Sequence, residues 1–361
     1  EEQVRQLLSP APIHPQSQEM LLSGIKEVFT EEDREMLSAE PTAAEVKAEV
    51  WRGNQIASPG TDGIILYFYK YYWKEIGEYL HLSVLDNFSR KALTKSQSVG
   101  LVVFRNKPGK GSSIKFKDKR RISLLNADYK INSGIFTSRL NKLSVKGLSP
   151  AQYVAGSDRR IHHCINMARD AVYKGNLNTR KGCGIQDNDF RAAFDLMMSS
   201  WPAQVLEKKG CGEIFKKWME SFFTDVVSTV VVNGVAGATI KLERSLRQGD
   251  IPSMLLFAYG LDPYLERLRD KLKGIVIYSE ELPVQGPVLE GENMLPPKLV
   301  EERLTAFGYA DDVKNCITSL QELVLVDEET KLFEQASGCE LHRVVNPDPN
   351  SAKVKILPLG K

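Results

Sequence analysis

The sequence predicts an α+β fold, because helical and strand patterns both occur along the chain. Apolar residues recur at helical spacing over stretches such as 129–143 and 253–272. A β-branched run at 226–232 ends at Asn233-Gly234, which is a strong signal for a hairpin turn. With 361 residues, 42% of them hydrophobic, the chain is expected to form a folded protein with two or more subdomains.

Composition excludes several classes of protein. The net charge of +2 is too small to indicate a nucleic-acid partner unless the basic residues cluster. The five cysteines are widely spaced and never form a Cys-x-x-Cys pair, which argues against a disulfide framework or a zinc site. Because a membrane-length apolar run and a signal-peptide pattern are both missing, we expect a reduced, intracellular protein. The first residue is not Met, so we expect a segment of something longer.

Residues 1–50 are predicted to be helical and peripheral. Thr42 and Glu45 have the spacing of a capping box, in which each side chain satisfies a free amide at a helix start. A dense turn cluster, Ser58-Pro-Gly-Thr-Asp-Gly63, then precedes an aromatic helix at 67–73. An ordinary surface turn would have the same composition as this cluster.

The most basic part of the chain lies between a predicted strand at 99–104 and a second one that starts at Ile122. Eight basic residues fall within this loop, against a single acid: Arg105, Lys107, Lys110, Lys115, Lys117, Lys119, Arg120 and Arg121. Interleaved glycines make the loop suitable for binding phosphates. A solvated hairpin tip is the alternative, and the sequence does not decide between them.

After helices predicted at 129–143 and 159–173, residues 184–190 read as a strand that turns into a helix. Asp189 is placed at the end of this strand, where open sheets often hold their chemistry. Asp187 would share its face by strand periodicity. Taken alone, Asp189 is expected to be a helix-capping residue rather than a metal ligand.

Residues 201–223 are predicted to be helical, and a hairpin follows with its second strand at 238–243. Gln248-Gly249 then stands at the junction with the helix at 253–272. Free backbone amides near a helix start favour a phosphate or a base. A loop-rich insertion follows near 278–300, most clearly at 283–297.

The segment Phe307-Gly-Tyr-Ala-Asp-Asp312 places two adjacent carboxylates at the tip of a hairpin, with 303–306 and 313–317 as its arms. Paired carboxylates at a tight turn are suitable ligands for Mg²⁺. A third carboxylate is needed, and Asp189 is the candidate. An Asp-Asp surface turn is the alternative. A helix at 320–337 and a short strand at 354–357 complete the chain.

In these stretches the sequence resembles the reverse transcriptases of LINE-type (non-long-terminal-repeat) retrotransposons. The resemblance covers nearly the whole chain from about Thr42, and it rests on the shared order of several motifs: SPGTDGI at 58–64, KPGKG at 107–111, RRISLLNADYKI at 120–131, DFRAAFD at 189–195, RQGDIPSMLLF at 247–257, FGYADD at 307–312, SGCELH at 337–342 and LPLG at 357–360.

The resemblance implies a right-hand polymerase fold with an antiparallel palm sheet. Residues 1–50 would form an N-terminal helical extension, 51–180 mainly the fingers, and 181–361 mainly the palm. The chain stops after the palm-like motifs, so we expect the thumb, endonuclease and zinc-binding regions to be lacking and processivity to be poor.

The resemblance also implies roles for individual residues. Asp189 and Asp311 would hold two Mg²⁺ ions, with Mn²⁺ as an alternative, and Asp312 would assist. Phe194 would close the sugar site against a 2′-hydroxyl. Four further residues would contact the nucleotide or template: Lys107, Arg120, Gln248 and Gly249.

Two residues depart from the family pattern. Arg121 stands where proline is usual, and Asn188 stands before Asp189 where an apolar residue is usual. A buried asparagine without partners would cost about 1–3 kcal/mol, which suggests an altered or degenerate element.

The resemblance therefore predicts an RNA-directed DNA polymerase that extends a DNA primer on an RNA template with deoxynucleoside triphosphates. Such a retrotransposon protein would be found in the nucleus and cytoplasm. A catalytically silent, RNA-binding scaffold is the alternative. An RNA-templated RNA polymerase is a third possibility, against which Phe194 argues. The sequence identifies neither the template, the target DNA, the host nor the oligomeric state.

Overall fold

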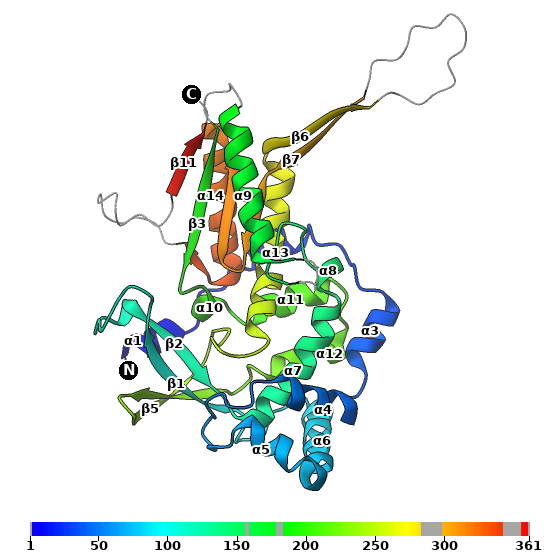
Figure 1. The fold of residues 1–361 in the computed structure, drawn as a ribbon, viewed down its shortest axis with the longest axis vertical. Helices are drawn as coiled ribbons and strands as arrows, with labels where there is room; N and C mark the ends of the chain where they lie inside the picture. The colour runs from blue at the N-terminus through cyan, green and yellow to red at the C-terminus, as the bar shows by residue number, and fades with distance from the viewer. Residues whose placement is uncertain (1, 156–158, 178–182, 283–297, 342–354, 360–361) are drawn as a thin grey trace, which may run out of the picture.

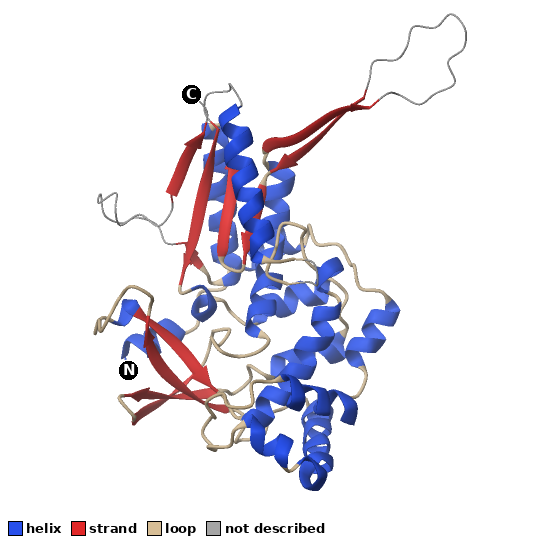
Figure 2. Cartoon of the chain, in the orientation of Figure 1, coloured by secondary structure: helices blue, strands red, loops and turns tan. Residues whose placement is uncertain are grey.

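The computed structural model describes residues 2–155, 159–177, 183–282, 298–341 and 355–359. Their helices are α1 (Glu2–Leu8), α2 (Pro15–Leu22), α3 (Glu31–Ser38), α4 (Ala43–Arg52), α5 (Leu66–Tyr71), α6 (Trp73–Arg90), α7 (Ala127–Lys142), α8 (Ser144–Gly147), α9 (Ile161–Leu177), α10 (Ala193–Leu196), α11 (Ser200–Lys208), α12 (Glu213–Ser221), α13 (Ser253–Lys271) and α14 (Leu320–Ser337), with a 3-10 turn η1 (Phe116–Asp118). The predicted α+β class is confirmed (Figure 2).

The strands of the described chain form three sheets. They are β1 (Val99–Asn106), β2 (Lys119–Leu124), β3 (Cys183–Arg191), β4 (Val227–Val232), β5 (Val235–Lys241), β6 (Ile275–Leu282), β7 (Lys298–Leu304), β8 (Ala306–Tyr309), β9 (Asp312–Ile317), β10 (Glu340–Leu341) and β11 (Lys355–Leu359). We call the sheet β10-β3-β9-β8, with β11 beside β3, the aspartate sheet, and the sheet β2-β1-β4-β5 the basic sheet. Figure 1 shows the aspartate sheet in the upper half of the molecule and the basic sheet at the lower left, with β6 and β7 forming a separate projecting ribbon.

The aspartate sheet is antiparallel throughout and is covered by helices on both faces. Ile185 packs against α9, whereas Phe190 packs in the main core with Phe333 of α14. Because side chains alternate along a strand, Asp187 and Asp189 lie on the α9 face. Both are only partly buried, so α9 covers one end of this face and leaves the aspartate end accessible.

The basic sheet is mixed, because β1 and β4 run parallel while the two hairpins β1–β2 and β4–β5 are antiparallel. The predicted turn is confirmed: Asn233 and Gly234 both have positive φ angles, of 52° and 80°. The second strand begins at Val235 rather than at Ala238, because Val232 pairs directly with Val235. Residues distant in sequence, at 99–124 and 227–241, therefore form one sheet.

The main core surrounds α13, most of whose residues are buried. The prediction of a peripheral segment at 1–50 is wrong for α3 and α4, since Leu37, Val46 and Val50 are fully buried in this core. The capping box of Thr42 and Glu45 is present as predicted. The N-terminal helices are thus an integral part of the fold.

The segment 201–223, predicted to be helical, forms two separate helices, α11 and α12. Gly210 and Gly212 break the helix, with φ angles of 91° and 80° that L-residues rarely adopt. The helices predicted at 129–143, 159–173, 253–272 and 320–337 are confirmed as α7, α9, α13 and α14, with ends that differ by a few residues at most. No helix in the described part of the chain is long and apolar enough to cross a membrane.

Candidate active site

The three predicted aspartates come together at one end of the aspartate sheet. In the antiparallel pair β3–β9, Asp189 lies directly opposite Asp312. Directly opposed residues on one face have Cβ atoms about 4.5–5.5 Å apart. Figure 1 shows that the α10 end of β3, which carries Asp189, faces the basic sheet.

Asp311 lies in the two-residue turn that joins β8 to β9. This hairpin was predicted, but its first arm is β8, whereas residues 303 and 304 belong to the projecting ribbon with β6. Burial raises the pKa of the Asp311 carboxyl to about 6. A hydrogen bond from its own backbone and the charge of Arg120 lower this pKa, whereas the charges of Asp312 and Asp189 raise it. The Asp311 carboxyl therefore interacts electrostatically with Asp189, Asp312 and Arg120.

The chemistry of these residues fits a hard divalent cation, because all three offer carboxylate oxygens; Asp189 and Asp311 are partly exposed and Asp312 is exposed. Among the described residues, no three His, Cys, Asp or Glu side chains converge closely enough to hold a metal ion by themselves. Mg²⁺ in phosphoryl-transfer sites is usually bound by one or two carboxylates together with substrate phosphates. The donor set is thus of the kind that a nucleotide completes.

Phe194 lies on α10, just after β3. Ala192 adopts a left-handed conformation, with φ of 43°, and this turns the chain sharply from the strand into the short helix. The Phe194 ring is half-buried and packs on Phe257, with ring centroids 4.8 Å apart. The Phe194 carbonyl accepts a hydrogen bond of 2.7 Å from the amide of Leu246, which joins this turn to the Gln248-Gly249 segment.

Gln248 and Gly249 lie in the loop between β5 and α13, against strand β2. They precede α13, which begins at Ser253 as predicted, so they lie at the junction between strand and helix. The Gln248 carbonyl accepts a hydrogen bond of 2.8 Å from the Ser123 amide. Gly249 has φ of 103°, and a Cβ atom there would lie 2.9 Å from the Ser123 carbonyl oxygen. Only glycine fits this close approach of two backbones.

Buried charges flank the Gln248-Gly249 turn. The Arg247 guanidinium and the Asp250 carboxylate form an ion pair of 3.2 Å, with side-chain exposures of 1% and 0%. The Tyr129 hydroxyl donates to Asp250 at 2.7 Å. These contacts fix the loop on α7, and the sequence analysis did not anticipate them.

The basic loop is a hairpin of β1 and β2, in which Arg105 pairs with Arg120. Arg120 is exposed and close enough to Asp311 to lower the pKa of its carboxyl. Lys107 lies beyond the end of the strand pairing, where its amide donates to the Asp118 carbonyl at 2.8 Å. Arg120 therefore acts electrostatically on the Asp311 carboxyl, and Lys107 lies farther along the hairpin.

Asn188 is fully buried, and its side chain has hydrogen-bond partners, contrary to the expectation. Its side-chain oxygen accepts a hydrogen bond of 3.0 Å from Gln186, and its amide donates to the Tyr264 hydroxyl at 3.2 Å. Tyr264 in turn lies 2.9 Å from the Thr330 hydroxyl. The cost expected for a buried asparagine without partners therefore does not apply to Asn188, since a polar network replaces the apolar packing.

Arg121, the second departure from the family pattern, forms an ion pair with Asp195. The Arg121 Nε donates to the Asp195 Oδ2 at 2.9 Å, and Nη2 contacts the same oxygen. The side chains are only 12% and 11% exposed. This pair joins strand β2 to the residue after Phe194. An arginine at this unusual position indicated that an ion pair was needed, but the sequence did not show that Asp195 is the partner.

Some predicted features lie outside the described residues. The loop-rich segment at 283–297 lies outside the described residues, as do the last residues of two motifs, His342 and Gly360.

The motifs, the opposed aspartates and the basic hairpin together define a nucleotide polymerase of the reverse transcriptase class. A family model described as "Reverse transcriptase (RNA-dependent DNA polymerase)" matches residues 106–343, which is more than half of the chain. The chain belongs to this family.

A particular relative is a "Transposon TX1 uncharacterized 149 kDa protein" of Xenopus laevis, which is 25% identical over 336 residues. The match covers 93% of this chain and 24% of that protein, so the chain spans about a quarter of the relative's length. Together, the two matches confirm the expected LINE-type reverse transcriptase domain and favour it over a silent scaffold.

Proposed function

We propose that this chain extends a DNA primer on an RNA template, with Asp189, Asp311 and Asp312 at the reaction centre. One observation carries the proposal: the β3–β9 register sets Asp189 opposite Asp312, beside the Asp311 turn. We assign the aspartate sheet and its helices to the palm, and the basic sheet with its neighbouring helices to the fingers.

In the proposed reaction the primer 3′-hydroxyl attacks the α-phosphate of a deoxynucleotide, and the bond to the β-phosphate breaks to release pyrophosphate. Asp189 and Asp311 would hold two Mg²⁺ ions, with Mn²⁺ as an alternative, and Asp312 would assist. Ions held there supply positive charge to the attacking and leaving oxygens. Arg120, whose charge already reaches Asp311, would bind the triphosphate.

The remaining nucleotide contacts follow from the positions of Phe194 and Gln248-Gly249. The half-buried Phe194 ring, held by Phe257, would lie under the sugar and exclude a 2′-hydroxyl. The turn at Gln248 and Gly249, fixed on β2, would support the base pair. Lys107, which follows the paired part of β1, would contact the triphosphate together with Arg120. We further propose RNA, DNA and deoxynucleoside triphosphates as partners, and the nucleus and cytoplasm as the location.

Primer extension on matched RNA and DNA templates in Mg²⁺ tests the proposal. The variant Asp311→Asn should reduce extension to background, because it removes a charged oxygen ligand. The matched control is Asp187→Asn, two residues from Asp189 on the same strand and face, whose exposed carboxylate pairs only with Lys314 at 2.6 Å among the contacts described. Equal activity of wild type and Asp311→Asn would refute the proposed centre.

The same assay tests the sugar site. Phe194→Ala should raise ribonucleotide incorporation relative to deoxynucleotide incorporation, because the smaller side chain leaves room for the 2′-hydroxyl. An unchanged ratio would remove Phe194 as the selecting residue. If RNA binds but no nucleotide is added with any divalent metal, the chain acts as an RNA-binding scaffold instead.

A further inference from the structure

The Gln152 side chain is fully buried against the turn that carries Asp311. Its Oε1 accepts a hydrogen bond of 3.1 Å from the Ala310 amide and one of 3.2 Å from the Val154 amide. Its Nε2 donates to the Ala310 carbonyl at 3.5 Å. One side chain therefore satisfies both backbone groups of the residue that precedes Asp311.

Ala310 needs this support because its backbone is in an unfavourable conformation. Its φ angle is 55°, in the left-handed region where the Cβ atom of an L-residue crowds the following carbonyl. Strained residues of this kind persist only where surrounding contacts hold them. The conformation of Ala310 sets the direction in which the chain presents Asp311, so a contact that fixes one fixes the other.

The backbone around Gln152 also runs beside β8. The Gly308 amide donates to the Ala151 carbonyl at 2.8 Å, and the Tyr153 amide donates to the Gly308 carbonyl at 2.9 Å. These two bonds form a parallel bridge between Gln152 and Gly308. The position of Gln152 relative to the turn is thus set by its backbone as well as by its side chain.

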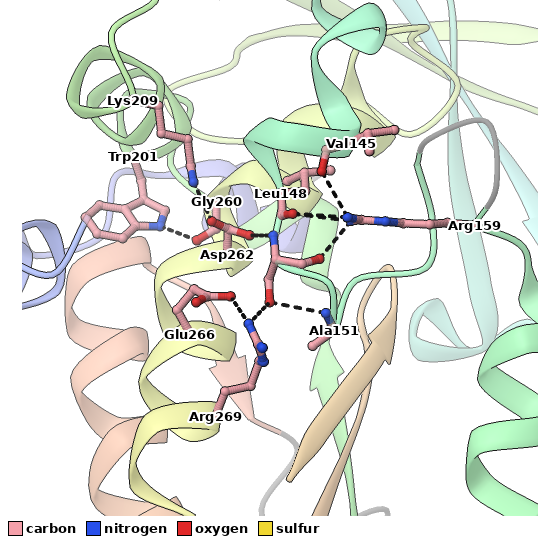
Figure 3. Close-up of polar contacts among 11 residues, drawn as sticks. Val145, Leu148, Ala151, Arg159, Trp201, Lys209, Gly260, Asp262, Glu266 and Arg269 are labelled. Carbon is pink, nitrogen blue, oxygen red and sulfur yellow. Dashed lines mark hydrogen bonds and ion pairs between the residues drawn. The ribbon is translucent and has the colours of Figure 1, made fainter. Parts of the chain in front are cut away.

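The residues just before Gln152 are anchored to the rest of the protein: Figure 3 shows the contacts of Arg159 with Val145 and Leu148. The Arg159 guanidinium donates to the carbonyls of Ser149 at 2.7 Å and Gln152 at 3.1 Å, and also to those of Val145 and Leu148. The Ser149 amide donates to Asp262 of α13, whose other oxygen is paired with Lys209 at 2.6 Å. The buried helix α13 therefore holds this segment in place.

We propose that Gln152 is a positioning residue that holds Ala310 in its left-handed conformation and thereby aims the Asp311 carboxylate at the metal ions. The proposal rests on the proposed function. Gln152 does not touch the reacting atoms in this arrangement. It acts through the turn, just as residues that hydrogen-bond to metal ligands in other proteins orient those ligands.

The test replaces Gln152 by leucine, which has a similar volume but lacks both polar groups, in the 361-residue chain. We expect Mn²⁺ binding, measured by calorimetry in the absence of nucleic acid, to weaken by about 10- to 100-fold, which is typical for loss of such support. The maximal rate of primer extension should fall by a similar factor. The affinity for template–primer should stay within about twofold, because the basic loop is untouched.

The matched control is Gln97→Leu. Gln97 is 2% exposed. Its side chain accepts a hydrogen bond from Asn87 and donates one to Asp128, and neither partner belongs to the turn that carries Asp311. This control should lower the melting temperature without changing Mn²⁺ affinity. If Gln152→Leu and Gln97→Leu lose stability alike and both keep wild-type Mn²⁺ affinity, Gln152 is merely structural and the proposal is wrong.

A second substitution tests the mechanism. Ala310→Gly removes the Cβ crowding at positive φ, so it should restore a large part of the Mn²⁺ affinity that Gln152→Leu loses. Strictly additive effects of the two changes would contradict the proposal. If Gln152→Leu does not fold, Gln152→Asn replaces it, because its shorter side chain cannot span both groups of Ala310, and the same losses are expected.

The outcomes separate this inference from the proposed function. If Asp311→Asn is inactive but Gln152→Leu behaves as wild type, only the role of Gln152 is refuted. If Asp311→Asn is fully active, the proposed centre itself is wrong.

Discussion

Replacing Arg121 by leucine is expected to destabilise the protein by about 3 kcal/mol, because it leaves the Asp195 carboxylate without its partner. The Nε and Nη2 atoms of Arg121 both donate to Oδ2 of Asp195, and the Asp195 side chain is only 11% exposed. Removing one member of a fully buried pair costs about 3–5 kcal/mol. Since a tenth of each side chain reaches solvent, the lower end of that range applies, which is roughly a 100-fold change in the unfolding equilibrium.

Urea unfolding followed by tryptophan fluorescence measures this change, provided that the slope of the transition is the same in both proteins. The double variant Arg121→Leu/Asp195→Asn should recover part of the loss, since it no longer buries an unpaired charge. Arg191→Leu is the matched control: its pair with Glu340 is exposed, at 62% and 47%, and its loss should cost about 0.5 kcal/mol or less. A cost for Arg121→Leu as small as that of the control would refute the reasoning.

Three further changes have definite expected outcomes. Gly249→Ala should reduce primer extension by about tenfold or more, since its Cβ would meet the Ser123 carbonyl at 2.9 Å; wild-type activity would contradict this close approach. Burial alone would raise the pKa of the Glu329 carboxyl. Its ion pairs with Arg267 and Lys271 of α13 outweigh this effect and hold the pKa below its ordinary value. This stabilisation is present above about pH 4.3 and is lost as the pH falls further, so between pH 7 and 3.5 the urea midpoint should fall more in wild type than in Glu329→Gln. Asn188→Val should cost about 1–3 kcal/mol by leaving the buried Gln186 amide unpaired, and a gain in melting temperature would show that the network contributes nothing.

Local patterns predicted much of the fold, because they depend on residues close together in the chain. Helical periodicity located α13 and α14, and Asn233-Gly234 located the β4–β5 turn. The two adjacent aspartates were correctly placed at a hairpin tip. In each case a few neighbouring residues determine the hydrophobic periodicity or the type of turn.

Long-range partners could not be predicted in this way. Arg121 and Asp195 are 74 residues apart, and Gln152 and Ala310 are 158 apart. The parallel pairing of β1 with β4 was missed for the same reason. A single sequence shows that a side chain needs a partner, but not which distant element supplies it. The candidate site was therefore predicted as a set of ligands, and the contacts that hold those ligands were not.

The two departures from the family pattern show how such contacts change the meaning of a substitution. An arginine in place of proline and an asparagine in place of an apolar residue would each be costly in a core without partners. Here the arginine has Asp195 and the asparagine has Gln186 and Tyr264, so both polar groups are accommodated beside β3. The stability of the aspartate sheet therefore depends on these pairings rather than on agreement with the family's usual residues. It follows that the capacity for nucleotide transfer has to be tested at the turn of Asp311, where the carboxylate and the left-handed backbone of Ala310 adjoin, and not inferred from Arg121 and Asn188.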